Sequence, residues 1–470
     1  MKTKLNKLLW LIFIILILIF LTLTAINTKN NLDAKSNQIE FLEKSLNKKK
    51  SQIKNIHEKL ISKNISLEDL VFSSGINFKK ESDLEIKLNS KNYVLSEFSS
   101  NDIIFAKHPS ASSSAYIETY ENNLFLITAT GQIAYSKINN ISSDKFKMIS
   151  IKSNIKDTIN YPEFFKSSPF GIKDALINEN NIYLSFIKEI NNDCYNTSVL
   201  KGKINYNYIN FSEFFSNADC IKKDDDFFKT NKHDKLVPHQ SGGRMIAIDD
   251  QILLTVGEYR LRILAQKQNS YFGKIISINK NSKKFKIISK GHRNPQGLYF
   301  SKEINKLFST EHGPNGGDEI NFIDLNETNN IPNYGWPISS YGDHYFEEKN
   351  DSRLKLSPLK KSHKKNGFIE PLKYFVPSVG ISQIIGVPKK FTDSNKLQFI
   401  VGTMGTAKKI KDGMLSLYIF EYDNLNNKIK DEKLIPINSR VRDIMYLSNL
   451  NSVIMFLETN STIGILRKKK

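Results

Sequence analysis

The stretch GHRNPQGLYFSKEINKLFSTEHGPNGGDEINFIDLNETNNIPNYGWP, from Gly291 to Pro337, contains the pattern that decides the fold. Two short apolar runs, LYF and KLFST, flank a polar turn, and this arrangement predicts a β-hairpin. A turn that carries Arg293 and Asn294 precedes the hairpin, and the Gly/Pro-rich loop EHGPNGGDE follows it. We therefore expect the side chains of Arg293 and Asn294 to project from the mouth of a strand.

The same pattern of apolar run, polar turn and second apolar run recurs along the chain. It begins at Tyr116, Ile172, Arg244, Gln296, Ser382 and Val441. Six hairpins at intervals of about 50 to 90 residues are typical of a radial array with one hairpin per blade. The sequence therefore predicts an all-β domain over residues 90–470, a six-bladed β-propeller. Long loops, such as Ile338 to Pro377, should gather at one end and form a pocket.

Residues 8–26 form an uncharged apolar run of 19 positions, preceded by Lys2, Lys4 and Lys7. That length suits the hydrocarbon core of a bilayer, and flanking lysines favour a cytoplasmic N-terminus. We expect residues 1–30 to be an N-terminal transmembrane helix that anchors the protein in the inner membrane, with the propeller in the periplasm. The alternative is a signal peptide that is cleaved near Ala25, which would make the protein secreted.

A helical stalk is predicted over residues 31–70. The apolar residues Ile39, Leu42, Leu46, Ile53, Ile56 and Leu60 fall at a/d spacing, although Lys49 occupies one d position. This pattern suits a short coiled coil and a possible homodimer. A single amphipathic helix packed on the main domain, or a simple spacer, is equally compatible with it.

Charge and cysteine content limit the classes of function. The net charge of the 470-residue chain is +20, and residues 1–65 contribute +8 of it, leaving +12 for the remainder. Because the lysines are dispersed, we expect a solvated basic surface and no nucleic-acid partner. No phosphate-binding glycine motif occurs, which disfavours a nucleotide cofactor. Cys194 and Cys220, the two cysteines of the chain, either form a disulfide or remain buried thiols.

Several residues suit acid–base and anion chemistry. His239 precedes the third hairpin and Glu258 follows it, so that a general base and a carboxylate that orients it are possible. A guanidinium such as Arg293 suits a carboxylate or a developing oxyanion. Arg440 and Arg442 would lie on one face of a strand, as a two-pronged clamp requires.

The segments GHRNPQG, EHGPNGGDEIN and NYGWP together resemble the quinoprotein sugar dehydrogenases, also called glucose/sorbosone dehydrogenases. The resemblance is specific over Pro238 to Pro337 and thinner over Pro377 to Arg442. It implies a six-bladed β-propeller that uses pyrroloquinoline quinone (PQQ). The implied reaction is oxidation of an aldose sugar or a related alcohol by hydride transfer to the quinone, with an electron acceptor that the sequence does not identify.

The resemblance also implies roles for individual residues. His239 would remove the hydroxyl proton, with Glu258 standing where the family typically has Asp. Arg293 and Asn294 would contact the quinone, with Arg293 stabilising the charge on the reduced oxygen, and Arg440 and Arg442 would clamp its carboxylates.

Calcium is implied at two positions. The backbone carbonyls of Gly313 and Pro314 match a loop that holds a cofactor-bound Ca²⁺, and Glu319 with the Tyr334 carbonyl matches a structural Ca²⁺ position. Carbonyl and carboxylate oxygens are the ligands that this ion prefers.

The chain departs from the family pattern at three places. An expected glutamine segment has no counterpart, and SASSSAYIE, from Ser110, stands near its place. Gly402 to Gly405 lacks the cofactor-binding lysine, for which Lys408 or Lys409 could substitute. Pro238 replaces an aspartate of the glucose enzyme, which disfavours glucose as the substrate. These departures favour an alternative function, a non-catalytic propeller that binds a carbohydrate or a protein partner; a metal-dependent hydrolase is a weaker possibility.

Overall fold

The computed structural model describes part of the predicted stalk, residues 31–70, and most of the propeller. The described residues are 38–55, 75–88, 91–103, 114–223, 236, 238–325, 330–345, 355–392, 396–405 and 413–469, with positions 24, 29, 32, 35, 36 and 58.

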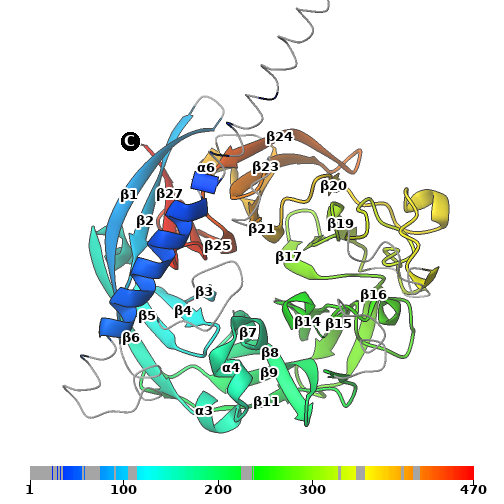
Figure 1. Ribbon diagram of the computed structural model, residues 1–470, viewed down its shortest axis with the longest axis horizontal. Coiled ribbons are helices and arrows are strands. Elements are labelled where there is room, and N and C mark those ends of the chain that lie inside the picture. Colours follow the sequence, from blue (N-terminus) through cyan, green and yellow to red (C-terminus); the bar gives the residue numbers. More distant parts are fainter. Residues whose placement is uncertain are drawn as a thin grey trace, which may run out of the picture.

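Antiparallel strands form five hydrogen-bonded sheets around a central axis, and the ten-stranded one supplies two blades (Figure 1). The innermost strands are β3, β7, β13, β17, β21 and β25, and each contacts the next around the ring until β25 meets β3. Every one of the six predicted hairpins supplies the two innermost strands of a blade. The chain is therefore all-β and forms a six-bladed β-propeller, as its sequence predicts.

The blades follow one another along the chain. The first two consist of β3 (Ala115–Tyr120), β4 (Asn123–Thr128), β5 (Ile133–Lys137) and β6 (Lys145–Ser153), then β7 (Ile172–Asn178), β8 (Asn181–Asn191), β9 (Cys194–Lys203) and β11 (Phe211–Phe215). The third and fourth consist of β13 (Gly242–Ile248), β14 (Gln251–Val256), β15 (Lys274–Asn279) and β16 (Phe285–Lys290), then β17 (Pro295–Ser301), β18 (Lys306–Glu311), β19 (Asp318–Ile323) and β20 (Lys373–Phe375). The fifth consists of β21 (Ile381–Val387), β22 (Leu397–Thr403), β23 (Ser416–Asp423) and β24 (Lys428–Pro436).

The last blade joins the two ends of the propeller. Its strands β25 (Val441–Leu447), β26 (Ser452–Leu457) and β27 (Thr462–Lys468) are completed by β2 (Lys91–Ser99) from the N-terminal side. β1 (Ile76–Leu88) then pairs with both β2 and β6, so that it bridges two blades. The sheet therefore begins at Ile76, ahead of the expected boundary at residue 90.

Short elements complete the fold. They are β10 (Tyr208–Ile209), β12 (Ile221–Lys222), α3 (Ile155–Thr158), α4 (Pro162–Lys166), α6 (Lys389–Thr392), and the 3₁₀ turns η1 (Ile138–Ser142), η2 (Ser168–Phe170), η3 (Pro238–Gln240), η4 (Arg262–Ala265) and η7 (Lys364–Asn366).

Turn chemistry explains why the inner hairpins close so tightly. β3–β4, β7–β8 and β13–β14 are joined by two residues each, and the first of these is Glu121, Glu179 or Asp249, with positive φ of 52°, 55° and 50°. Two-residue hairpin loops need this left-handed backbone, because its twist matches that of the flanking strands. Apolar clusters fill the space between neighbouring blades, and β14, buried along nearly all of its length, places Ile252 and Leu254 in one cluster and Leu253 in another.

One buried arginine ties the innermost strands together at the axis. The Nη1 atom of Arg244, in β13, donates to Asp174 of β7 and to Asp443 of β25 at 2.7 Å each. Asp443 also accepts the backbone N–H of Ile117 in β3 at 2.9 Å. The Nε of Arg244 donates to the carbonyl of Gln296 in β17 at 3.1 Å. This cluster therefore links five blades through the centre of the ring.

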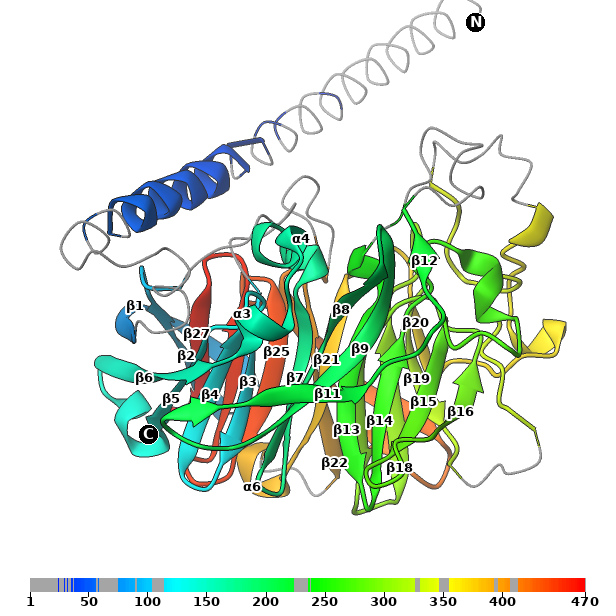
Figure 2. The same cartoon turned by 90° about the horizontal axis from the view of Figure 1, so that it is seen from below.

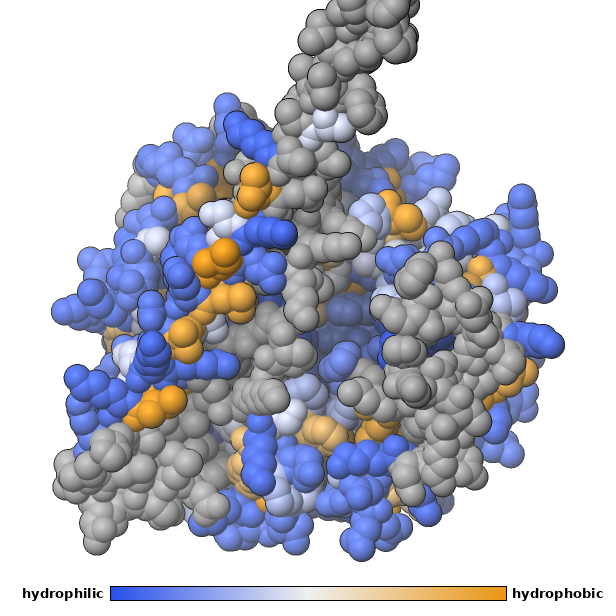
Figure 3. All heavy atoms as spheres, in the orientation of Figure 1, coloured by the Kyte–Doolittle hydropathy of each residue, from blue (hydrophilic) through white to orange (hydrophobic). Residues whose placement is uncertain are grey.

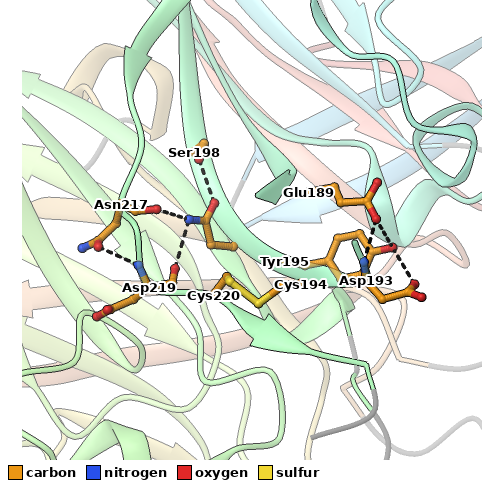
Figure 4. The surroundings of a disulfide bond; sticks show 9 residues. Glu189, Asp193, Cys194, Tyr195, Ser198, Asn217, Asp219 and Cys220 are labelled. Atoms are coloured by element: carbon orange, nitrogen blue, oxygen red, sulfur yellow. Dashed lines mark hydrogen bonds between the residues drawn. A yellow bond between two sulfur atoms is a disulfide. The ribbon is translucent and has the colours of Figure 1, made fainter. Parts of the chain in front are cut away.

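Cys194 and Cys220 form a disulfide with an S–S distance of 2.05 Å. The bond ties β9 to the segment that precedes β12 (Figure 4). The Asn196 amide holds the same segment by donating to the carbonyls of Asn217 and Asp219. Of the two states that the sequence leaves open for these cysteines, the structure has the disulfide.

Apart from positions 24 and 29, the predicted transmembrane segment, residues 1–30, lies outside the described residues. Within the part of the chain that the structure describes, no helix is both long and apolar enough to span a membrane. The stalk helix, residues 38–55, is described and lies on the same side of the propeller as α4 (Figure 2).

Arg244→Met is expected to lower the free energy of unfolding by roughly 3–5 kcal/mol, because Asp174 and Asp443 would remain buried without their cation. Urea denaturation of the purified chain measures this change. Arg467→Met is the control, since Arg467 of β27 donates a hydrogen bond of 3.3 Å to Ser96, and its loss should cost about 1 kcal/mol or less. Equal losses in the two variants would contradict a central role for the axial cluster.

Candidate functional site

A cavity of about 410 Å³ opens at the mouth of the propeller. The segments that lead into the innermost strands supply much of its wall, and Figure 3 shows the hydrophilic hollow at the centre of this face. Its volume falls in the range of small-molecule sites, about 300–1,000 Å³. The lining residues with polar side chains include His239, Gln240, Arg293, Asn294, His312, Asn315, Asp318, Tyr345, Ser378 and Arg440.

His239 occupies the junction between this cavity and a second, smaller one. It lies in η3, directly before β13, and its side chain is exposed while Pro238 and Gln240 beside it are buried. The Asn294 amide donates to the His239 carbonyl at 3.3 Å, and the Asn294 oxygen accepts the Gly242 N–H at 3.1 Å. Asn294 therefore fixes the turn that presents the imidazole to the cavity.

Arg293 is held in place by aromatic and carbonyl groups. Its guanidinium lies 5.4 Å from the ring centroid of Trp336, a distance at which a cation is attracted to the aromatic face. Nη1 donates to the His312 carbonyl at 3.1 Å, and Nη2 lies 3.4 Å from the Tyr345 hydroxyl. The side chain is thus oriented before any ligand binds.

Glu258 acts on this site through an intervening amide. With the Gln240 amide in the orientation that satisfies its neighbours, its nitrogen donates to Glu258 at 2.8 Å and its oxygen accepts from Arg293 at 3.1 Å. Burial raises the pKa of Glu258 to about 7, although Arg293 and Arg262 favour its charged form. Glu258, which the sequence predicts to orient His239, therefore accepts its hydrogen bond from Gln240. The same Gln240 amide links Glu258 to Arg293.

Arg440 and Arg442 share a single carboxylate. Arg440 donates from Nε and Nη2 to Glu458 Oε2 at 3.1 Å each, and Arg442 donates from Nε to Oε1 at 2.5 Å. Both side chains thus lie on one face of the strand, with Arg440 bordering the main cavity and Arg442 the smaller one. Burial lowers the pKa of Arg440 while Glu458 opposes that shift. The predicted clamp is consequently half neutralised by a protein carboxylate.

The smaller cavity, of about 40 Å³, lies on the propeller axis. The register between paired strands shifts by one residue at the start of β7, β17 and β25. The extra residues are Lys173, Gln296 and Arg442, and all three line this cavity. Such bulges redirect a side chain that regular alternation would place elsewhere. Burial lowers the pKa of Lys173 to about 7, and Arg442 adds to the effect.

The bulge in β13 depends on a glycine. Gly243 has φ +108°, and a Cβ there would lie 2.2 Å from the Cβ of Lys173. Only glycine therefore fits between the third blade and the lysine of the second.

The loop of residues 313–317 is held by a buried carboxylate. Asp318 accepts backbone N–H groups from Gly313 at 3.0 Å and from Val379, Gly380 and Ile381 at 3.1, 2.7 and 3.2 Å. These bonds occupy both carboxylate oxygens of Asp318. The loop backbone, including Gly313 and Pro314, is thereby placed against the cavity.

The two predicted calcium positions differ in how well they suit the ion. The carbonyl-bearing residues Gly313 and Pro314 border the main cavity, so a cation beside a bound cofactor fits there. Glu319 instead lies 3.0 Å from the His363 imidazole and accepts from Asn321 at 3.2 Å. Burial opposes charge on His363, but Glu319 outweighs it and raises the pKa of this histidine. Both carboxylate oxygens of Glu319 therefore already have a polar partner within the chain, His363 and Asn321. Among the described residues, no group of three or more His, Cys, Asp and Glu side chains could hold a metal.

The structure thus brings His239, Arg293, Asn294 and Arg440 around one cavity and places Arg442 and Glu258 just behind its wall. Sequence reasoning missed Lys173, Gln240, Gln296, His312 and Glu458. His312 lies within the EHGPNGG segment and Gln240 within HQSGG, so these motifs could have indicated both as site residues. No local pattern indicated Glu458. Lys408 and Lys409, the predicted substitutes for the missing lysine, lie outside the described residues.

Fold and site together define a six-bladed β-propeller that holds a histidine and guanidinium groups at its mouth. The glucose/sorbosone dehydrogenase profile matches residues 143–467, and the chain belongs to this family.

Two curated proteins and one solved structure illustrate the similarity. The chain is 30% identical over 197 residues to the uncharacterized protein slr1608 of Synechocystis, covering 39% of this chain and 42% of that protein. It is 33% identical over 136 residues to quinoprotein glucose dehydrogenase B of Acinetobacter calcoaceticus, covering 22% of this chain and 27% of that protein. The crystal structure of the soluble aldose sugar dehydrogenase of Escherichia coli shares the fold, with a TM-score of 0.56, 17% identity, and coverage of 76% of this chain and 95% of that one. The matched regions thus span less than half of either curated relative.

Glu258→Gln is expected to change the pH dependence of stability. The folded pKa of about 7 lies above the ordinary value of 4.5, so between these values the folded chain binds more protons than the unfolded chain. The wild-type unfolding free energy should therefore fall as pH rises through this window, a loss that the variant escapes. The unfolding free energy of the variant minus that of the wild type should therefore be roughly 1–3 kcal/mol more positive at pH 8 than at pH 4. Urea denaturation across pH measures it, and a pH-independent difference would contradict the assignment.

Proposed function

We propose that this protein is a PQQ-dependent dehydrogenase that oxidises an aldose sugar or a related alcohol, with His239 as general base. The observation that carries the proposal is the convergence of His239, Arg293 and Arg440 on one cavity at the propeller mouth. Membership of the glucose/sorbosone dehydrogenase family and similarity to a protein named as a quinoprotein support it.

The residues around the cavity suit a planar anion such as PQQ. Arg293 and Arg440 would face its carboxylates and carbonyl oxygens, and Asn294 stands beside them. Arg293 is already oriented by Trp336 and His312, so little reorganisation is needed on binding. When bound, PQQ supplies an acceptor for the two electrons that leave the sugar carbon as hydride. Ca²⁺ would be held beside it by the carbonyls of Gly313 and Pro314.

His239 would take the proton of the substrate hydroxyl. Its imidazole is exposed to the cavity, and a base near neutral pKa is effective in this role. The carbon gives up hydride while the oxygen gives up its proton to the imidazole, which leaves a carbonyl product. Arg293, tied to Glu258 through Gln240, would stabilise negative charge at the same place.

The apolar residues 8–26 support export of the propeller and an anchor in the inner membrane. A sugar substrate in the periplasm would then reach the mouth without crossing that membrane.

A non-catalytic propeller is the second candidate, and one observation favours it. Glu458 pairs with both Arg440 and Arg442, which weakens the site for a ligand with several carboxylates. Such a protein would bind a carbohydrate or a protein partner without redox chemistry.

His239→Ala is expected to slow sugar oxidation by about 10²–10⁴-fold, the range for loss of a general base. The full-length chain is supplied with PQQ and Ca²⁺, and bleaching of the cofactor absorbance by aldoses is followed. The matched control is His344→Ala, because the His344 ring lies against Arg262 at 3.1 Å and does not line the cavity. Cofactor binding without bleaching in the wild-type chain would favour the second candidate.

Arg293→Gln is expected to weaken PQQ binding by roughly 10–100-fold, since bonds from a charged donor are worth about 1.5–3 kcal/mol. Isothermal titration of PQQ into the variant measures the effect separately from turnover. The control is Arg260→Gln, whose guanidinium lies 5.6 Å from the Tyr345 ring but outside the cavity lining. Unchanged affinity in Arg293→Gln would remove Arg293 from the cofactor site.

A further inference from the structure

The stalk helix rests on the propeller with its polar side inward. The Gln52 side chain is buried and donates to the Ile103 carbonyl at 2.6 Å, and Asn55 donates to Asp102 at 3.0 Å. Lys48 is held near Glu81 and Glu97 of the two N-terminal strands. Polar contacts therefore fix this helix to the propeller.

The apolar side of the same helix faces outward. Ile39, Leu42, Leu46 and Ile53 are 57%, 54%, 52% and 67% exposed. Figure 3 shows them as a hydrophobic stripe on the face that also carries the hollow centre of the propeller. An amphipathic helix normally buries this side. The stripe therefore needs a partner outside the described chain.

A second copy of the chain is poorly suited to cover the stripe. A two-stranded coiled coil needs both flanks of its seam open for knobs-into-holes packing. One flank, with Ser45 and Gln52, is turned toward the propeller, where Gln52 is buried. Lys49 also interrupts the seam.

An anionic lipid surface suits the helix better. Residues 38–55 contain five lysines and two glutamates, a net charge of +3. The flanking Lys44 and Lys54 side chains pair with Glu40 and Glu58 and are 65% and 79% exposed. Apolar residues on one side with lysines beside them are typical of helices that lie in a membrane interface. Eleven residues separate the uncharged run of residues 8–26 from Gln38, a distance of at most roughly 40 Å along the chain.

We propose that the outward face of the stalk helix, Ile39, Leu42, Leu46 and Ile53 with their flanking lysines, binds the surface of an anionic phospholipid membrane. Because the stripe and the cavity share one face of the molecule, this contact turns the propeller mouth toward the lipid (Figures 1 and 3). If the proposed function holds, a lipid-dissolved electron acceptor has the shortest path to the cavity in this orientation.

The test uses single added cysteines in the full-length chain, since both natural cysteines are joined in a disulfide. Leu46→Cys carries an NBD fluorophore, and Leu425→Cys is the matched control because Leu425 is 96% exposed in the outer turn of the fifth blade. Both are reconstituted in vesicles of phosphatidylcholine and phosphatidylglycerol with a nitroxide-labelled lipid. We expect quenching at residue 46 to exceed that at residue 425 at least about twofold, and the excess to fall as salt rises.

Equal quenching at the two positions would overturn the proposal. Close approach of residue 46 labels on two copies, measured by dipolar spin coupling and without lipid quenching, would also overturn it in favour of a dimer. Leu42→Glu should reduce the quenching at residue 46, whereas Leu425→Glu should leave it unchanged. These measurements need neither PQQ nor sugar, so their outcome is independent of whether the proposed enzymatic function is correct.

Discussion

The ion pairs of the Arg244 guanidinium with Asp174 and Asp443 are the constraint on which the arrangement at the propeller axis depends. Both carboxylates also accept backbone N–H groups of a neighbouring blade, from Met245 and Ile117. Buried charges require such complete pairing, because an unmatched one would be costly in a low-dielectric interior. The start of each of these innermost strands is therefore held at a fixed distance from the axis.

The positions of these strand starts determine the shape of the candidate cavity. Bulges beside the axial cluster direct Lys173, Gln296 and Arg442 inward, while η3 and the turn before β17 carry His239 and Arg293 to the rim. The residues that line the cavity thus lie on short irregular segments, which a rigid ring of sheets supports. Glu458 offsets much of the positive charge of Arg440 and Arg442. Of these two and Arg293, only Arg293 has no carboxylate in direct contact among the described residues.

The stalk helix lies on the same face of the propeller as this site. Its polar contacts with Ile103 and Asp102 fix it beside the last blade, and its apolar stripe shares the face of the cavity. The chemistry at the mouth and the membrane contact that we propose are therefore related by geometry, although the residues that serve them are far apart in the chain.

The sequence by itself determined the number of blades, because each inner hairpin repeats a local pattern of apolar runs and turn residues that needs no distant partner. It also indicated His239, Arg293 and Arg440 through motifs at strand starts, and these residues do meet at one cavity. Tertiary structure alone decided that Glu258 bonds to Gln240, that Glu458 joins two arginines, that Glu319 faces His363, and that the stalk turns its polar side inward. Those outcomes depend on which side chains meet across blades and on bulges that shift register by one residue, and neither is encoded in a local period.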